Sequence, residues 1–163
     1  MIRRDNREYY RLAVKRVFDD RLADARNTII RFLVQKGTMP TVTDFVKVHK
    51  VSENEASLLY QHLHDAHALF LDADGSIRML WPFSGIPTSF RVSTGQQSYW
   101  ANCAWDAIGI AAALHTDVKI QAVVSYTDEQ IELHVENDAV VPGNFLVHFP
   151  LPVAKWYDDL VYT

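Results

Sequence analysis

Cys103 and Asp106 are the two residues of this sequence whose types and spacing are best suited to chemistry. Within a helix, a spacing of three positions places both side chains on one face. A thiol near the start of a helix is favoured in its thiolate form by the helix dipole. A carboxyl group one turn away can transfer a proton or serve as a hard metal ligand. The same two residues also fit a buried structural cysteine beside a surface aspartate.

Aromatic residues flank this pair along the chain, at Tyr99, Trp100 and Trp105. They are candidates for the walls of an apolar substrate pocket next to the thiol. The same residue types are equally typical of an ordinary hydrophobic core. The sequence leaves both interpretations open.

Two other polar clusters are weaker candidates for a functional site. Of His62, His64 and His67, only the last two share a helical face, and no fourth ligand is near, so we expect solvated or interfacial histidines rather than a zinc site. The tract DADG at 72–75 resembles the start of a calcium loop, but an apolar segment follows where further ligands are needed. We expect it to be a turn.

Composition places the chain among globular proteins. It has 163 residues, of which 48% are hydrophobic and 22% charged, and it contains one cysteine. That length suits one domain or two small units that share a core. A single cysteine excludes a disulfide framework within the sequence. No apolar run is long enough for a membrane span, and the first residues lack the apolar stretch of a signal peptide. We therefore expect a cytoplasmic protein without membrane contact.

Charge is distributed unevenly between the two parts of the chain. Residues 1–50 contain 12 Lys and Arg against 6 Asp and Glu, whereas residues 51–163 contain 4 against 14. A basic N-terminal part favours nucleic-acid binding. The helix that would enter a DNA groove, residues 52–67, contains Glu53, Glu55 and Asp65 and has no Lys or Arg. Because phosphate contacts need cations, we do not expect nucleic-acid binding.

The N-terminal part is predicted to be helical. Apolar residues recur at three-to-four spacing over 5–36, and Gly37 and Pro40 end that pattern. A short helix follows up to about residue 50, with Thr41 or Thr43 as its cap. Ser52 and Glu55 form the pattern of a capping box that opens a further helix. Residues 69–71 and 77–81 are predicted to form a hairpin around the turn at 72–75.

The C-terminal part is predicted to be a small α+β unit. Two prolines and one glycine in 82–87 indicate a boundary without regular structure. Strands are predicted at 90–93, 118–126, 130–135 and 145–149, and a helix at 99–114. The fold class is therefore α+β. We expect a winged-helix-like unit at 1–81, followed at 82–163 by a small mixed or antiparallel sheet with a cysteine-bearing helix.

The C-terminal part resembles the organomercurial (alkylmercury) lyase family. The resemblance is carried by PFS at 82–84, PT at 87–88, RV at 91–92 and, most specifically, YWANCAWDAIGI at 99–110. It extends loosely over the whole chain, because that family also has a winged-helix-like unit before its catalytic unit. Residues 82–163 are thus expected to be an alkylmercury-lyase-like catalytic unit.

The resemblance implies a site and a reaction. In the family, two cysteines and one aspartate cleave a carbon–mercury bond, and Cys103 and Asp106 match the first cysteine and the aspartate. Both residues would then bind the metal as well as catalyse. No organic cofactor is implied, because mercury arrives with a small organomercurial substrate. Mercuric reductase or small thiols are the partners expected to remove the ion.

The second cysteine of the family has no counterpart in these residues. Its position falls at the end of the chain or just beyond it, and the chain ends at Thr163 in an apolar tract. We expect the catalytic unit to be truncated, with the reading frame continuing to a cysteine or, through a UGA codon, to a selenocysteine. The chain as given is then inactive or weakly active. Two alternatives stay open: a winged-helix transcription regulator with a cysteine-based metal or redox sensor, and a non-catalytic heavy-metal binder.

Overall fold

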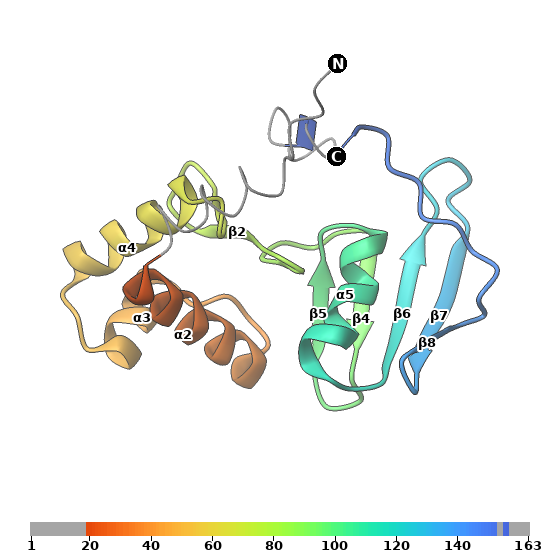
Figure 1. Cartoon of the computed structure of the whole chain (residues 1–163), viewed down its shortest axis with the longest axis horizontal. Helices are drawn as coiled ribbons and strands as arrows, with labels where there is room; N and C mark the ends of the chain where they lie inside the picture. Colours follow the sequence, from red (N-terminus) through yellow and green to blue (C-terminus); the bar gives the residue numbers. More distant parts are fainter. Residues whose placement is uncertain (1–18, 153–154, 157–163) are drawn as a thin grey trace, which may run out of the picture.

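Three helices form the first part of the structure, a computed structural model that describes residues 19–152 and 155–156. They are α2 (Asp20–Lys36), α3 (Val42–His49) and α4 (Glu53–Asp65), shown in red to yellow in Figure 1. Each has an apolar stripe that faces the others. The buried residues on these stripes are Leu22, Ala25, Ile29, Leu33, Phe45, Ala56, Leu59, Tyr60 and Leu63.

Side-chain caps fix where these helices begin. Asp19 is the N-cap of α2, and its carboxylate accepts a hydrogen bond from the backbone N–H of Leu22 over 2.9 Å. Thr41 caps α3 in a complete capping box with Asp44. Ser52 caps α4 through the backbone N–H of Glu55, but the Glu55 carboxylate forms an ion pair with Arg21. The capping box predicted at Ser52 is thus only half formed, because Arg21 of α2 recruits its carboxylate.

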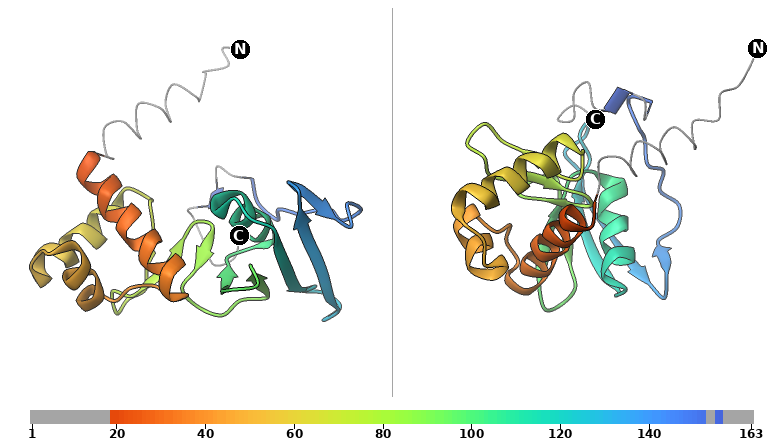
Figure 2. Two further views of the ribbon diagram at one scale, coloured as in Figure 1. Left: turned by 90° about the horizontal axis from the view of Figure 1, so that it is seen from below. Right: turned by 60° about the vertical axis from the view of Figure 1, so that its left-hand side comes forward.

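An eight-stranded antiparallel sheet forms the rest of the described chain. Its strands are β1 (Phe70–Leu71), β2 (Ile77–Leu80), β3 (Phe83–Ser84), β4 (Phe90–Ser93), β5 (Ser98–Ala101), β6 (Val118–Val123), β7 (Gln130–Glu136) and β8 (Ala139–Val141). They lie in the order β1-β2-β3-β5-β4-β6-β7-β8. One helix, α5 (Ala104–Leu114), packs on β3, β4, β5 and β6. Figures 1 and 2 show α5 against this sheet, with β2 leading from it toward the three helices. The predicted α+β class is confirmed.

A single hydrophobic cluster joins the helices to the sheet. It includes Ile29 of α2, Leu63 of α4, Leu80 of β2, Val92 of β4 and Ile110 of α5, each with almost no exposed surface. Burial of such side chains contributes about 1.5–3 kcal/mol each. The strands that carry the candidate site are therefore held by packing that begins in the N-terminal helices.

Arg26 adds a polar link between the two parts. Its guanidinium donates hydrogen bonds to the carbonyl oxygens of Ala68, over 3.3 Å, and Trp81, over 3.0 Å. Burial lowers the pKa of this arginine. The bond to Trp81 ties α2 to the residue between β2 and β3, close to the candidate site.

Two helix predictions need correction. The helix predicted over 5–36 begins at Asp20, because Asp19 has an extended backbone and caps it; residues 5–18 lie outside the described residues. The helix predicted over 99–114 is shorter as well. Residues 98–101 form β5, where Tyr99 and Ala101 face the core and Trp100 does not. The apolar residues on one face of this strand run directly into the helical pattern that follows, so spacing alone does not separate the two elements.

Three predictions for the sheet region also need correction. Residues 82–87 were expected to lack regular structure, yet Phe83 and Ser84 pair with β2 and β5. The strand predicted at 145–149 is not present, and Leu146 is 97% exposed. That segment alternates like a strand but pairs with none of the described strands, and β8 is the edge strand beside β7. The strand predicted at 118–126 ends at Val123.

None of the helices in the described ranges combines the length and the apolar character that crossing a bilayer requires.

Candidate functional site

Cys103 occupies the N-cap position of α5. Its backbone is extended, with φ −150° and ψ −179°, and no side-chain hydrogen bond caps the helix there. Ser, Thr, Asp or Asn is normally preferred at this position, because their oxygen atoms accept from the free N–H groups of the first turn. A cysteine in this place leaves a thiol beside the positive end of the helix dipole. Local sequence preference is set aside where a functional group is needed.

Asp106 lies in the first turn of α5, three positions after Cys103, and Asn102 orients it. The Asn102 amide donates from Nδ2 to Oδ2 of Asp106 over 3.0 Å and to the carbonyl oxygen of Phe83 over 3.2 Å. The second bond anchors the amide to β3. The carboxylate is thereby held by the sheet as well as by its own helix. The sequence motif identified Cys103 and Asp106, but Asn102 was missed because its partner on β3 is far away in the sequence.

Burial raises the pKa of both groups. For Cys103 the loss of solvent is the largest cause, the negative charge of Asp106 acts in the same direction, and the backbone N–H groups of Asp106 and Trp105 oppose it. For Asp106 the loss of solvent again dominates, and the interactions with Asn102 and Cys103 lower its pKa in part. The expected thiolate-stabilising effect of the helix end is therefore outweighed by burial. Burial thus favours the neutral thiol of Cys103, and the Asp106 carboxyl group lies beside it.

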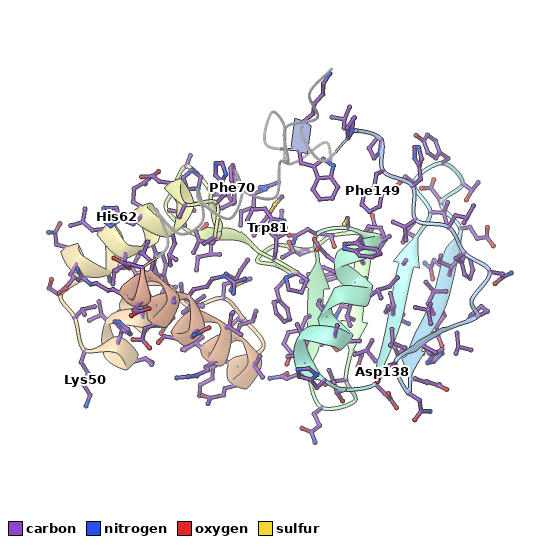
Figure 3. The ribbon with its side chains drawn as sticks, viewed as in Figure 1. Lys50, His62, Phe70, Trp81, Asp138 and Phe149 are labelled. Carbon is purple, nitrogen blue, oxygen red and sulfur yellow. The ribbon has the colours of Figure 1, made fainter. Side chains whose placement is uncertain are left out.

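A cavity of about 340 Å³ opens above this end of α5. Cys103 and Asp106 both line it, together with Asn102. Figure 3 shows Trp81 and Phe149 on the same side of the molecule, near the end where α5 begins. The remaining lining residues are Arg78, Met79, Trp81, Ser84, Ile86, Pro87, Thr88, Ser89, Phe90, Trp105, Phe149 and Trp156. The wall is thus largely apolar with a few polar groups, which is typical of a small-molecule site.

Three aromatic side chains from distant segments form one side of the cavity. Trp105 meets Phe149 edge to face, with ring centroids 6.3 Å apart, and Phe149 stacks on Trp156 at 5.4 Å. The indole N–H of Trp156 donates to the carbonyl oxygen of Leu151 over 3.0 Å. Trp105 is 58% exposed, so it stands at the rim of the cavity. Sequence reasoning missed Phe149 and Trp156, because neither lies near the motif in the chain.

The other two predicted pocket residues lie elsewhere. Tyr99 faces the core, packs edge to face on Phe83 and donates its hydroxyl to the carbonyl oxygen of Val34 over 3.3 Å. Trp100 lies on the opposite face of β5, where the guanidinium of Arg91 stacks over its ring at 4.4 Å. Of the three predicted aromatic residues, the structure brings only Trp105 to the cavity.

His64 and the tract 72–75, which the sequence offered as possible metal ligands, have structural roles instead. The backbone N–H of Leu71 donates to Nδ1 of His64 over 3.1 Å, so this histidine anchors β1. The tract 72–75 is a turn, as predicted, closed by the bond from Gly75 N–H to the carbonyl oxygen of Asp72 over 2.9 Å. Across the described residues, no group of three or more His, Cys, Asp or Glu side chains is arranged to hold a metal ion.

Two comparisons with known proteins found a match. The family model "MerB: Alkylmercury lyase" matches residues 83–163. A solved structure described as the mercury-bound form of MerB2 superposes with a TM-score of 0.63 at 22% identity. The match covers 82% of this chain and 64% of that one, so this chain spans less than two thirds of the length of its structural relative. No curated protein matches the sequence.

Proposed function

This chain belongs to the alkylmercury lyase family, and we propose that its cavity at the start of α5 binds a small organomercurial and cleaves the carbon–mercury bond by protonolysis. The observation that carries the proposal is the placement of Cys103 and Asp106 in one turn on the wall of one cavity. Asn102, which holds the Asp106 carboxylate, supports it. The proposed place of action is the cytoplasm, where a free thiol stays reduced.

The proposed chemistry follows from the bond to be broken. Mercury(II) is a soft acid, and a thiolate is its preferred ligand. A carbanion is a very poor leaving group, so the carbon has to be protonated while the bond breaks. Coordination by sulfur pushes electron density through the metal onto that carbon. A proton source beside the sulfur completes the requirement.

In the proposed sequence of steps, the Cys103 thiol transfers its proton to the Asp106 carboxylate as sulfur binds mercury. The protonated Asp106 then donates this proton to the carbon, and the electron pair of the carbon–mercury bond becomes the new carbon–hydrogen bond. The products are a hydrocarbon and a mercuric ion bound to Cys103, with Asp106 again a carboxylate. The raised pKa values of both groups support this role, because burial makes each group hold a proton more tightly than it would in water.

Headspace detection of methane from methylmercury, or benzene from phenylmercury, tests the proposal. Cys103→Ser should abolish both mercury binding and hydrocarbon release. Asp106→Asn should keep binding and lower release by about 100-fold or more, the usual contribution of a positioned proton donor. Asp138→Asn is a matched control, since Asp138 lies in the β7–β8 turn with φ +63°, a conformation that asparagine tolerates, and does not line the cavity.

The possible outcomes separate the candidate functions. Equal release by the wild type, Cys103→Ser and Asp106→Asn would overturn the proposed reaction. Mercury binding by Cys103 without any hydrocarbon release would instead favour a non-catalytic heavy-metal binder. A DNA-binding regulator is disfavoured by α4, whose sequence ENEASLLYQHLHD contains no Lys or Arg.

One requirement of the proposed reaction lies outside these residues. Cys103 is the only cysteine among the 163 residues, so they supply a single thiolate to the mercuric ion. A second sulfur ligand and the eventual removal of the ion, by mercuric reductase or by small thiols, are part of the proposal.

A further inference from the structure

Arg78 of β2 is the one basic side chain among the described residues that line the cavity. Its side chain is 24% exposed. One of its nitrogens, Nη1, lies 3.1 Å from the Asp72 carboxylate. That partner is itself 32% exposed and lies across the β1–β2 turn, where solvent weakens the pairing. The cavity therefore has a cationic group on the wall contributed by β2, while the acid–thiol pair comes from α5.

Two of the residues that line the cavity have polar atoms without a hydrogen-bond partner among the described residues. Within the described part of the chain, two buried side-chain atoms lack a hydrogen-bond partner, Nε of Arg78 and Oδ1 of Asn102, and both residues line the cavity. One is a donor and the other an acceptor. Buried polar atoms are nearly always paired in folded proteins, so each exception calls for an explanation, of which a bound ligand is one. A ligand with an anionic acceptor suits Arg78, since an arginine recognises a carboxylate through two adjacent N–H groups.

The proposed reaction indicates which anionic ligand Arg78 would bind. The ion prefers sulfur ligands, and these residues supply one, from Cys103. Resting on the function proposed above, we propose that Arg78 binds the carboxylate of a small thiol carboxylic acid, and that this thiol is the second sulfur ligand of mercury in the cavity.

The step is balanced with this thiol in place. The substrate is an organomercury thiolate, R–Hg–S–R′, whose R′ group carries the carboxylate. The proton of the Cys103 thiol passes through Asp106 to carbon, the carbon–mercury bond breaks and the bond from mercury to the Cys103 sulfur forms. The products are R–H and a mercuric ion between Cys103 and the thiol sulfur. No electron is gained or lost by either sulfur or by mercury.

Methylmercury adducts of two thiols test the inference. One is the adduct of 3-mercaptopropionate and the other that of its methyl ester, which lacks the negative charge. We expect kcat/KM for methane release to be about tenfold or more higher for the carboxylate, as for a charge-assisted hydrogen bond. Arg78→Met should bring this ratio close to one. Arg91→Met is the matched control, because the Arg91 guanidinium stacks on Trp100 and does not line the cavity.

A second measurement identifies the product. Native mass spectrometry after turnover should find one 3-mercaptopropionate retained with each mercuric ion on the wild type. If Arg78→Met fails to fold, the ratio of kcat/KM for the two adducts in the wild type and in Arg78→Lys still decides. Lysine keeps the charge without the paired N–H groups, so it should lower this ratio in part. Equal kcat/KM for the two adducts in the wild type, or mercury bound without thiol, would overturn the inference.

If the chain does not cleave carbon–mercury bonds at all, the same experiment gives a result that differs from failure of the Arg78 inference. It would appear as no methane from either adduct. Mercuric chloride with each thiol then tests the inference by mass spectrometry alone. Preferential retention of the carboxylate thiol by the wild type, lost in Arg78→Met, would support the subsite, and equal retention would overturn it.

Discussion

The amide of Asn102 donates a hydrogen bond to the carboxylate of Asp106, with Nδ2 3.0 Å from Oδ2. The second N–H of the same amide is engaged by the carbonyl oxygen of Phe83 on β3, 3.2 Å away. A carbonyl oxygen can only accept, so this contact fixes which end of the amide faces Asp106. Asp106 therefore always meets a donor, which favours its carboxylate form and fixes its direction toward the cavity.

Asn102→Leu is expected to impair proton transfer more than mercury binding. Loss of the donor raises the pKa of Asp106 further and frees the carboxylate to rotate. The acidic limb of the pH–rate profile for hydrocarbon release should move to higher pH, because the reaction begins with Asp106 as a carboxylate. At neutral pH we expect kcat to fall by about tenfold or more, with KM nearly unchanged. Asn54→Leu on the exposed face of α4 is the control, and the same shift of the limb in both variants would contradict the assigned role.

Asp106→Asn is expected to change the pH dependence of stability. Burial raises the pKa of Asp106 in the folded chain above its unfolded value, so the folded state binds this proton more tightly. That contribution to stability is complete below the unfolded pKa of about 4 and is lost as the pH rises through the folded value. Asparagine does not titrate, so the variant should gain in Tm relative to the wild type between pH 4 and pH 8. Thermal unfolding of the mercury-free protein measures the difference, and a constant offset over this range would refute the prediction.

Trp105→Ala is expected to alter substrate preference with little effect on folding. Trp105 stands at the cavity rim and meets Phe149 edge to face at 6.3 Å, a contact of about 0.5–1.5 kcal/mol. Its removal should raise KM for phenylmercury by about tenfold and for methylmercury by much less, because only an aryl group is large enough to pack on the indole. Steady-state kinetics with both substrates measures this. Trp100→Ala, on a residue that does not line the cavity, should leave the ratio of the two KM values unchanged.

Gly85→Ala is expected to destabilise the strand that carries Arg78. A Cβ at Gly85 would lie 2.0 Å from the carbonyl oxygen of Ile77, which is backbone and cannot move aside freely. The Gly85 N–H also donates to the carbonyl oxygen of Arg78 over 2.7 Å, so the two segments are in close contact. We expect a loss of about 2–4 kcal/mol in the free energy of unfolding by denaturant.

Gly75→Ala is the matched control for this substitution. Gly75 has φ +81° in the β1–β2 turn, and a Cβ added there would meet no other atom within 4 Å. Its cost is therefore about 1–2 kcal/mol, from backbone strain alone. A smaller loss in Gly85→Ala than in Gly75→Ala would contradict the close approach of β2 to residue 85.

Local sequence was sufficient to predict those features whose interactions join residues close together in the chain. The N-cap at Ser52 and the turn at Gly75 depend on atoms a few positions apart and were predicted in place, and the cap of α3 is Thr41, one of the two threonines predicted for it. The motif containing Cys103 and Asp106 was readable for the same reason, since both residues lie within one turn of helix. Predictions were wrong where an element depends on a distant neighbour. Residues 98–101 form a strand that pairs with the distant β3 as well as with β4, whereas residues 145–149 pair with no strand of the described chain.

The sequence by itself therefore determined the α+β class, the acid–thiol pair and the family resemblance. Only the tertiary structure decided what surrounds that pair: Asn102 anchored by Phe83, Arg78 on the facing wall, and Phe149 and Trp156 beside Trp105. It also decided the direction in which the pKa of Cys103 is shifted, because burial raises it although the helix end favours a thiolate. The physical reason is that cavities, desolvation and long-range hydrogen bonds arise between segments far apart in the chain, and no pattern of neighbouring residues specifies them.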